Sequence, residues 1–353
     1  MPCAYINRVA TAVPAHDVHR KFVEYAPSLL SDERTRALFR RMADRAQIDH
    51  RYSCLAVDLA SEALDRRGFY PRGHFPNTLA RMKLYEAEAP PLAFQALENL
   101  DLRASAGNIT HVIVASCTGF YAPGLDLQII HQFGLRQSVG RTFVGFMGCH
   151  AAINALNVAQ HIVRSEPAST VLVVNLELCT IHLQETPDLE QILSFLIFAD
   201  GCSACLVSAE PVGIHLKRFR STILPDSADK ITWHVGQSGF DMMLSGRVPQ
   251  TILLNLPANL DSVLAGARAE DIALWAIHPG GRTVIDAVGE ALHLDDDKLS
   301  YSRRVLRQFG NMSSATVMFV LKDILKSSAA GLGCAMAFGP GMMAESLLFE
   351  IAA

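Results

Sequence analysis

Short apolar runs alternate along most of the chain with segments whose apolar residues recur at helical spacing. The runs predict buried strands, and the spaced segments predict helices that pack on them. Residues 1–105 are mostly helical after an opening strand, with helices expected over residues 56–67 and 91–102. Beyond residue 111, strands are predicted over 112–116, 141–146, 171–178, 204–208, 213–224, 240–244, 273–277, 335–338 and 346–351. Helices are predicted between them over 124–133, 151–163, 251–267, 282–294 and 313–326.

This alternation predicts a layered α/β fold. Strands that are apolar on both faces need helices on both sides. The segment 151–163 is apolar on nearly every side, which is typical of a helix enclosed between two sheets. The later part of the chain repeats the alternation of apolar strands and helices seen in the earlier part. We therefore expect two similar halves, residues 1–212 and 213–353.

The composition is that of a large globular protein. Of 353 residues, 50% are hydrophobic and 19% are charged, which is enough for more than one packed core. The formal net charge of -4 argues against a nucleic-acid-binding protein, whose field is normally positive. No apolar run approaches the roughly 20 residues of a membrane span, and the N-terminus lacks the pattern of a secretory signal. We therefore expect a cytoplasmic protein whose eight cysteines are free thiols.

Cys149 follows a predicted strand and a glycine turn, at the start of the apolar helix. The unpaired N–H groups and partial positive charge of a helix N-terminus favour a thiolate, which is a good nucleophile and acyl carrier. A small buried filler is the alternative, because most free cysteines are buried and inert. The local sequence alone favours neither.

Two other candidates stand at the ends of predicted elements. His278 ends the strand 273–277 and precedes Pro-Gly-Gly, at the kind of strand end where open α/β sheets bind ligands. Most histidines at such places are structural or exposed. Asn311 precedes the helix 313–326, where an ordinary N-cap explains an asparagine equally well.

Cysteines and arginines also form two local clusters. Cys202 and Cys205 form a CxxC pair in an apparent strand of small residues, without the second pair or histidines that a zinc site needs. We expect these two to pack rather than bind metal. Arg41 and Arg45 lie one helical turn apart in an arginine-rich segment. A solvated face is the common explanation, and phosphate binding is the alternative.

Four motifs together resemble those of the type III polyketide synthases, the chalcone-synthase-like members of the thiolase fold. They are the glycine–cysteine turn at 145–152, His-Pro-Gly-Gly at 278–281, Gly-Asn-Met-Ser-Ser-Ala at 310–315 and Phe-Gly-Pro-Gly at 338–341. The motifs occur in the order of the family, and the resemblance extends from about Arg8 to the last predicted strand. It implies a thiolase-like αβαβα fold.

The resemblance implies a chemistry for the three candidates. Cys149 would take a starter acyl group from coenzyme A as a thioester, which the enolate of decarboxylated malonyl-CoA then attacks. His278 and Asn311 would donate hydrogen bonds to the thioester oxygen of malonyl-CoA, and His278 would pair with Cys149 to hold a thiolate. Coenzyme A thioesters would be the substrates of a homodimer that uses no further cofactor and no metal.

Other roles follow from the same resemblance. Phe198 would gate the junction of the CoA tunnel and the reaction cavity, although core packing is the usual role of a phenylalanine. Ser313 would lie in the cavity or cap its helix. Glu177 would line the inner cavity, where burial requires hydrogen bonds. For the phosphates of CoA, Arg41 matches a contacting arginine, Arg45 falls on a usual lysine, and Leu38 replaces a second lysine.

Several positions depart from the plant chalcone synthases. Cys117, Cys179 and His182 stand where those enzymes have threonines, and Trp233 stands where they have a glycine. Ala122 replaces the methionine that reaches across the plant dimer. Cys117 makes the wall less polar, and Trp233 and His182 reshape the cavity. These exchanges are similar to bacterial members that take long fatty acyl starters and release alkylpyrones or alkylresorcinols.

We therefore predict an acyltransferase that condenses malonyl-CoA repeatedly onto a fatty acyl-CoA starter and cyclises the product to an alkylpyrone or alkylresorcinol. A chalcone- or stilbene-type synthase with an aromatic starter and a single-condensation ketoacyl synthase are alternatives within the superfamily. A Cys-His-Asn hydrolase and a non-catalytic binding protein are alternatives from other classes. The expected partners are acyl-CoA and malonyl-CoA, with no nucleic acid and no membrane span.

Overall fold

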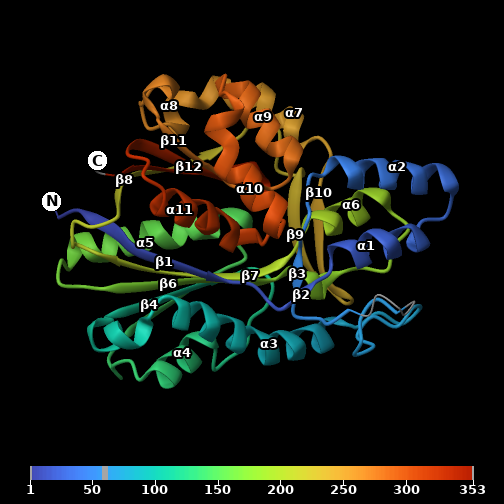
Figure 1. Cartoon of the computed structure of the whole chain (residues 1–353), viewed down its shortest axis with the longest axis horizontal. Helices are drawn as coiled ribbons and strands as arrows, with labels where there is room; N and C mark the ends of the chain where they lie inside the picture. Colours follow the sequence, from blue (N-terminus) through green and yellow to red (C-terminus); the bar gives the residue numbers. More distant parts are fainter. Residues whose placement is uncertain (1, 58–62, 352–353) are drawn as a thin grey trace.

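The computed structural model describes residues 2–57 and 63–351, and its centre is one continuous nine-stranded mixed sheet (Figure 1). The strand order is β11-β12-β13-β8-β1-β7-β6-β4-β5, in which β4 runs parallel to β5 and β6, and β11 runs parallel to β12. These strands are β1 (Ala4–Ala12), β4 (His111–Ser116), β5 (Gly140–Gly145), β6 (Val171–Leu178), β7 (Asp200–Ser208), β8 (Ile214–Ile223), β11 (Leu274–Ile277), β12 (Gly331–Gly339) and β13 (Met343–Ile351).

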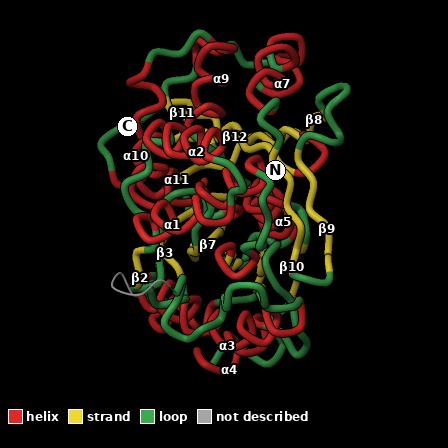
Figure 2. The backbone as a smooth tube through the Cα atoms, turned by 90° about the vertical axis from the view of Figure 1, so that its right-hand side faces the viewer, coloured by secondary structure: helices red, strands yellow, loops and turns green. Residues whose placement is uncertain are grey.

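The helices form three layers that enclose the two ends of this sheet (Figures 1 and 2). α3 (Thr78–Asn99) and α4 (Leu125–Phe133) form one outer layer. α5 (Ala151–Ser165) and α11 (Thr316–Lys326) form the middle layer and contact strands of both ends. The other outer layer consists of α7 (Val248–Asn255), α8 (Leu260–Val263) and α9 (Arg282–Leu292). The predicted layered α/β fold is confirmed.

Shorter elements gather at one end of the molecule (Figure 1). The hairpin of β9 (Ile231–Gly236) and β10 (Gly239–Leu244) stands there, and β10 contacts α6. The elements completing the fold are α1 (His19–Tyr25), α2 (Glu33–Arg45), α6 (Leu189–Ile197), α10 (Ser300–Phe309), and the strand pair β2 (His16–Asp17) and β3 (Tyr52–Ser53).

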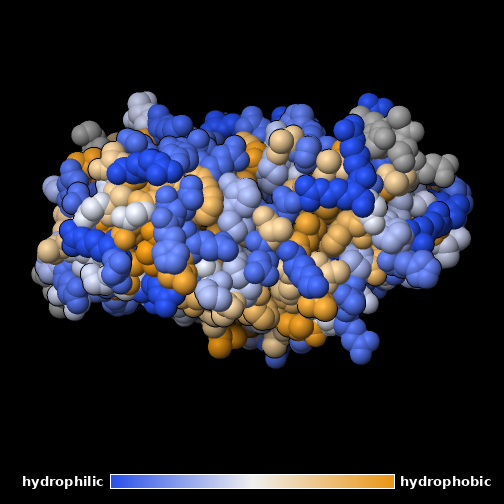
Figure 3. All heavy atoms as spheres, turned by 90° about the horizontal axis from the view of Figure 1, so that it is seen from below, coloured by the Kyte–Doolittle hydropathy of each residue, from blue (hydrophilic) through white to orange (hydrophobic). Residues whose placement is uncertain are grey.

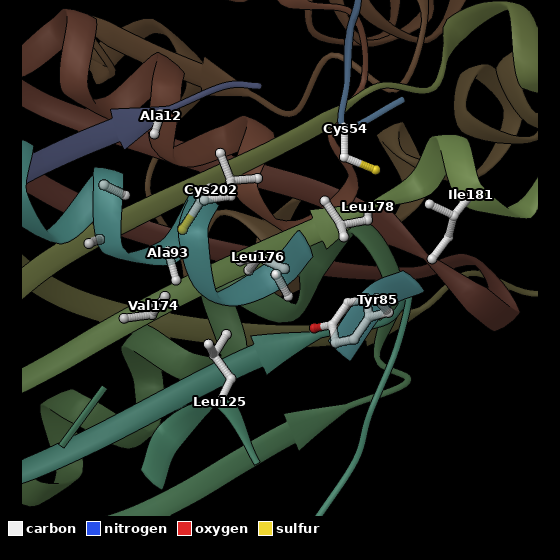
Figure 4. Close-up of a cluster of buried hydrophobic side chains, with 14 of the residues drawn as sticks. Ala12, Cys54, Tyr85, Ala93, Leu125, Val174, Leu176, Leu178, Ile181 and Cys202 are labelled. Atoms are coloured by element: carbon white, nitrogen blue, oxygen red, sulfur yellow. The ribbon is translucent and has the colours of Figure 1, made fainter. Parts of the chain in front are cut away.

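Three apolar cores lie between the layers. Figure 4 shows part of the core between α3 and the sheet, where Tyr85 and Ala93 of α3 are buried together with Val174, Leu176 and Leu178 of β6. The middle core encloses α5, whose residues are buried on most sides because sheet strands cover two of its faces. Side chains on β6 are buried on both faces of the strand, as the continuous apolar run predicts.

The structure corrects several predicted elements. The helix expected over 251–267 breaks at Pro257, between α7 and α8, because a proline ring removes a helical N–H and clashes with the preceding turn. The helix expected over 56–67 lies partly outside the described residues, and its described part, 63–67, forms bends and turns. The helical spacing of Arg41 and Arg45 agrees with α2, whereas β9, α6 and α10 were not predicted. β7 ends at Ser208 and β8 begins at Ile214, while the division of the chain after residue 212 stays a prediction.

Among the described residues, no helix combines the length and the apolar composition that crossing a membrane requires.

Candidate active site

Cys149 lies in a single 3-10 turn, Gly148–His150, that joins β5 to α5. The sequence placed it at the first position of the helix, but α5 begins two residues later, at Ala151. Gly148 has a φ of +76°, and a Cβ there would meet the ring of Pro340 at 2.2 Å. Glycine at position 148 therefore allows both the positive φ of this turn and the close approach of Pro340 in the C-terminal Phe-Gly-Pro-Gly segment.

The surroundings of Cys149 act against ionisation of its thiol. Burial raises its pKa to about 12, although hydrogen bonds from Ser313 and Asn311 act in the opposite direction and the nearby Glu177 carboxylate raises it further. Burial therefore opposes the resting thiolate that a helix N-terminus favours, and the thiolate stays a prediction. Desolvation outweighs the helix field because water is excluded around the sulfur.

His278 follows β11 directly and extends its pairing, since its N–H donates to the carbonyl of Met336 at 2.7 Å. The side chain is 2% exposed, and burial lowers the pKa of its imidazole to about 3. Nδ1 and Nε2 both lack a hydrogen-bond partner among the described residues. The expected pairing with Cys149 is thus not formed in this structure. The neutral ring retains one free donor and one free acceptor.

Asn311 is fixed by its backbone and by one end of its side chain. Its N–H donates to the carbonyl of Ile197 at 2.8 Å, and its carbonyl accepts from Ala199 at 2.9 Å. Oδ1 accepts from the N–H of Ser313 at 2.8 Å, while Nδ2 makes a longer bond of 3.3 Å to the carbonyl of Gly280. Asn311 does not cap α11, which begins at Thr316 with Ala315 as its N-cap. Its Oδ1 instead holds the turn at Ser313, while Nδ2 bonds to Gly280.

Cys149, His278 and Asn311 line one cavity at the ends of β5 and β11, and most of its remaining wall is apolar. The structure thus brings together three residues that are separated by 129 and 33 positions in the sequence (149, 278 and 311). Four other predicted residues also line this cavity. They are Cys117, Phe198, Trp233 and Ser313.

Two of these wall residues have a distinct environment. The sulfur of Cys117 accepts a hydrogen bond of 2.9 Å from the N–H of Gly148, which holds the nucleophile turn. The indole of Trp233 packs edge-on to the rings of His182 and Phe240, and its Nε1 is buried without a partner among the described residues. Two residues of the wall, His278 and Trp233, therefore carry buried polar atoms without a partner among the described residues.

Glu177, Cys179 and His182 are not among the residues that line this cavity, so their expected place in its wall stays a prediction. Cys179 lies behind it, in an apolar cluster with Phe198 and Met242 against which Cys149 packs. Nε2 of His182 donates to the carbonyl of Thr118 over 2.7 Å, and its Nδ1 accepts from the N–H of Phe240 at 3.1 Å. Burial lowers the pKa of His182 to about 3, in keeping with a neutral ring.

Glu177 is fully buried and fully hydrogen-bonded. Its carboxylate accepts from the N–H of Cys117 at 2.9 Å, from the hydroxyl of Thr118 at 2.8 Å and from the hydroxyl of Ser314. Burial raises its pKa to about 7 in spite of these bonds. We call the connected residues Thr118, Glu177, His182 and Ser314 the supporting cluster.

A groove at the protein surface continues into the cavity, since Leu244, Val248, Gly280 and Val284 line both. Met42 and Arg45 of α2 line the groove, whereas Arg41 is exposed outside it. Arg282 at the start of α9 also lines it and donates to the carbonyl of Arg45 at 3.1 Å. Sequence reasoning missed Arg282, although its position directly after two glycines at a helix start was a usable signal.

Sequence reasoning also missed Ile231, Met242 and Leu244 in the cavity wall. Ile231, Trp233 and Val235 alternate with polar residues, which is the period of a strand. Recognising that alternation predicts β9, and β9 with β10 supplies this side of the wall.

Cys202 and Cys205 lie on opposite faces of β7. Cys202 belongs to the core beneath α3, and Cys205 belongs to the middle core. Because the sheet separates the two thiols, they cannot jointly bind one metal ion. No group of three His, Cys, Asp or Glu side chains suited to a metal occurs in residues 2–57 and 63–351.

Comparison with known proteins agrees with this site. The family model described as "Chalcone and stilbene synthases, N-terminal domain" matches residues 3–211, and the model of the C-terminal domain matches residues 215–352. The chain is 33% identical over 366 residues to the "Alpha-pyrone synthesis polyketide synthase-like Pks18" of Mycobacterium tuberculosis, covering 99% of this chain and 91% of that protein.

Two solved structures share the fold over nearly the whole chain. The C-terminal type III polyketide synthase domain of Steely1 from Dictyostelium has a TM-score of 0.90 at 24% identity, covering 99% of this chain and 100% of the domain. PKS-I of the brown alga Ectocarpus siliculosus has a TM-score of 0.89 at 26% identity, covering 100% of this chain and 99% of that one.

The chain therefore belongs to the family of chalcone and stilbene synthases. It is a type III polyketide synthase, and hence an acyltransferase with the thiolase-like layered fold.

Proposed function

We propose that this enzyme loads an acyl group from coenzyme A onto Cys149 and extends it by repeated decarboxylative condensation with malonyl-CoA. The observation that carries the proposal is the single cavity that contains the Cys149 thiol, the unpaired ring nitrogens of His278 and the Nδ2 of Asn311. A cavity with free donors near a nucleophile suits a reaction in which negative charge develops on oxygen.

The first step transfers the starter. The sulfur of Cys149 attacks the thioester carbonyl of acyl-CoA, and the free acceptor nitrogen of His278 takes the thiol proton. The carbon–sulfur bond to CoA breaks, and the leaving thiolate receives that proton to give free CoA. A neutral thiol beside a neutral imidazole is a suitable starting state, because charges need to form only as the bond forms.

The second step forms the carbon–carbon bond. Malonyl-CoA loses carbon dioxide, and the electron pair of the broken bond forms an enolate whose oxygen accepts from the N–H of His278 and from Nδ2 of Asn311. The enolate carbon attacks the thioester on Cys149, and the sulfur leaves as thiolate. The product is a 3-ketoacyl-CoA that reloads Cys149 for a further round.

A fatty acyl starter fits the wall of the cavity best. Met242, Leu244, Val248 and Phe338 give it an apolar lining, and the Cys117 sulfur is already bonded to the backbone. The similarity to a protein named for alpha-pyrone synthesis supports cyclisation to an alkylpyrone, with an alkylresorcinol as the related product. Trp233 of β9 narrows one side of the cavity, and it packs near Cys179 and His182.

The groove between α2 and α9 is the proposed path of the coenzyme A thioesters that the reaction uses as substrates. The proposed reaction requires no further cofactor. Arg45 and Arg282 supply positive charge along it, and Arg41 stands outside it as an exposed cation. Guanidinium groups bind phosphates through paired N–H donors. The two arginines in the groove are therefore the better candidates for phosphate contacts.

Exposed apolar residues at and near the edge of the sheet support the homodimer that is expected from the family. β5 is the edge strand of the sheet, and Phe143 on it is 47% exposed. Phe120 and Met147 are 51% and 39% exposed, and Figure 3 shows hydrophobic side chains gathered on the face seen from below. An exposed apolar edge is typical of a protein–protein interface.

The eight free cysteines agree with a cytoplasmic location.

Product analysis tests the function. Malonyl-CoA is incubated with saturated acyl-CoA starters of six to eighteen carbons and with coumaroyl-CoA, and the products are identified by mass spectrometry. We expect alkylpyrones or alkylresorcinols from the long starters and no product from Cys149→Ala. A single added two-carbon unit indicates a ketoacyl synthase instead, and preferred turnover of coumaroyl-CoA contradicts the fatty acyl assignment. Polyketide formation by Cys149→Ala contradicts the central role of this cysteine.

A further inference from the structure

The outward face of α2 carries a row of arginines beside the groove. Arg34, Arg41 and Arg45 recur at helical spacing, so they lie on one side of the helix, and all three are exposed. Leu38 and Met42 lie on the same side and are 37% and 41% exposed. We call these five residues the basic face.

The other sides of α2 attach the helix to the protein and leave the basic face outward, at the periphery of the molecule (Figure 1). Phe39 and Ala43 are buried, and the helix contacts α6. Glu33, Arg40 and Asp44 share one flank, where Glu33 pairs with Arg40 at 2.9 Å. The basic face therefore carries three positive charges, with Asp44 as an exposed carboxylate on its flank.

The charge of the basic face is opposite to that of the chain as a whole. The formal net charge is -4, whereas three arginines are concentrated on one side of a single helix. Such a patch attracts and orients a partner of opposite charge over roughly 8 Å at physiological ionic strength. The partner that fits is therefore an acidic molecule.

The basic face extends well beyond the groove. Arg45 and Met42 line the groove, whereas the other three residues of the face lie outside it. Because a helix rises about 1.5 Å per residue, Arg34 and Arg45 are separated by about 16 Å along the axis. Phosphates bind to cations and gain little from Leu38, but an exposed apolar side chain among arginines is typical of a protein-docking surface. Coenzyme A in the groove therefore leaves the outer part of the basic face unused.

An anionic lipid surface also matches the charge. Helices that bind membranes insert a broad apolar side into the lipid. The apolar side of α2, with Phe39 and Ala43, is buried against the protein, and only Leu38 and Met42 face outward. A protein is therefore the better occupant.

We propose that the basic face docks an acidic acyl carrier protein that delivers the starter, which rests on the loading step of the proposed function. A carrier protein holds its acyl group on the same phosphopantetheine arm that coenzyme A contains, so one groove can accept either donor. The carrier would lie on the basic face while its arm follows the groove past Arg45. Leu244 and Val248 line both the groove and the cavity, so the arm would reach Cys149 along them.

The transfer from the carrier is a thioester exchange. The sulfur of Cys149 forms a bond to the acyl carbon, and the bond from that carbon to the pantetheine sulfur breaks. The proton of the Cys149 thiol passes to the pantetheine thiolate. The carrier therefore leaves with a free thiol, and no further reactant is consumed.

The rate at which Cys149 is acylated tests the proposal. Octanoyl groups are supplied either on a purified bacterial acyl carrier protein or on coenzyme A, and the acyl-enzyme is measured by mass spectrometry of the intact protein. We expect Arg34→Glu to slow loading from the carrier about tenfold or more and to leave loading from octanoyl-CoA unchanged. Arg34 lies in the first turn of α2, where a carboxylate suits the helix dipole, so this variant should fold normally.

Two further variants separate docking from binding in the groove. Arg45→Glu changes a residue of the groove, so it should slow loading from both donors. Lys326→Glu makes the same change of charge at the exposed end of α11 and should slow neither.

The outcomes also separate this proposal from the proposed function. Equal slowing of both donors by Arg34→Glu, or unchanged loading from the carrier, overturns the docking proposal. So does a carrier that fails to load the wild type while octanoyl-CoA loads it, which leaves the proposed function intact. Sedimentation of the wild type, but not of Arg34→Glu, with phosphatidylglycerol vesicles would assign the basic face to a membrane instead. Failure of both donors to acylate Cys149 overturns the proposed function as well.

Discussion

The catalytic cavity and the supporting cluster lie side by side and contain similar residue types, but their polar atoms differ in how they are paired. His278 has two unpaired ring nitrogens in the cavity, whereas both nitrogens of His182 have partners in the cluster. Burial lowers the pKa of each ring to about 3, so neither the charge nor the depth distinguishes them. The difference lies in the hydrogen bonds that the fold leaves open for a substrate.

Glu177 belongs to the supporting cluster, where the polar atoms are paired. The family resemblance gave it a place in the cavity wall, but its carboxylate is used by Cys117, Thr118 and Ser314. Through these bonds it fixes the residues that follow β4 and the segment that begins α11, which carry Cys117 and Ser313 into the cavity. We therefore infer that Glu177 positions the site without contacting substrate.

The largest expected effect concerns the donor on Asn311. Asn311→Asp retains an oxygen that can accept from Ser313 but replaces the Nδ2 donor with a second acceptor. Losing one such donor raises a barrier by about 3–4 kcal/mol, so malonyl-CoA decarboxylation should slow about a hundred- to thousandfold. The rate of carbon dioxide release from malonyl-CoA measures this directly.

The matched control separates the Nδ2 donor from the Oδ1 acceptor. Asn311→Ala removes both, so it should lower the melting temperature more than Asn311→Asp does, because the N–H of Ser313 loses its partner. Equal decarboxylation rates in Asn311→Asp and the wild type would show that the donor is not used.

A large change in stability is expected from the supporting cluster. Glu177→Ala leaves the hydroxyls of Thr118 and Ser314 and the N–H of Cys117 unpaired in a buried place. We expect the free energy of unfolding to fall by about 3 kcal/mol. Chemical denaturation measures this loss.

Glu177→Gln is the control for that change. It keeps the shape and one acceptor oxygen, and the Ser314 hydroxyl can turn to accept from the new amide, so the loss should be below about 1 kcal/mol. Soluble Glu177→Gln protein should also keep most of its activity. A complete loss of activity in this variant would instead indicate that the carboxyl group acts on substrate.

The sequence predicts those features of the cavity and the supporting cluster that depend on neighbouring residues. It does not predict those that depend on residues far apart in the chain. Strands such as β6 are set by a local apolar run, and the predicted bounds 171–178 match the observed strand. The motifs around Cys149, His278 and Asn311 give the chemistry of the cavity. The pairing of Glu177 with Ser314 spans 137 positions, and no local pattern in the chain encodes it.

The same limit applies to the ionisation of Cys149. A helix N-terminus is visible in the sequence, but the desolvation that raises the pKa of the thiol comes from segments far away in the chain. Likewise, the breaking of the helix 251–267 was readable at Pro257, whereas the place of Trp233 beside His182 depends on how the β9–β10 hairpin docks.

The titration of Glu177 makes the stability that the supporting cluster contributes depend on pH. Burial raises its pKa from 4.5 to about 7, so the folded protein binds a proton that the unfolded chain releases between these values. Stability from this group is therefore present at low pH and falls as the pH rises from 4.5 towards 7, by about 3 kcal/mol. Glu177→Gln lacks this titration.

Melting temperatures of the two proteins from pH 5 to pH 8 measure the effect. The buried imidazoles of His182 and His278 have lowered pKa values and destabilise both proteins equally at low pH, so only the difference between the curves is informative. We expect Glu177→Gln to gain stability relative to the wild type as the pH rises. Parallel curves would show that Glu177 stays ionised throughout this range.

The smallest expected effect concerns Trp233, a residue of the cavity wall whose buried Nε1 is an unpaired donor among the described residues. The growing chain carries a keto group at every second carbon, and a free N–H in the wall can hold one of these oxygens. Trp233→Phe removes the donor and keeps an aromatic ring, whereas Trp233→Ala also removes the bulk. A hydrogen bond of this kind contributes about 0.5–1.5 kcal/mol, so its loss changes the balance of products by up to about tenfold.

The measurement is the ratio of twice-extended to once-extended products from one acyl-CoA starter, together with the rate of Cys149 acylation. If Nε1 holds the chain, Trp233→Phe lowers the ratio and leaves acylation unchanged, because the donor acts only after the first extension. If Trp233 serves only to fill space, Trp233→Phe resembles the wild type and only Trp233→Ala alters the products. The second outcome would remove Trp233 from the set of unpaired groups that distinguish the cavity from the supporting cluster.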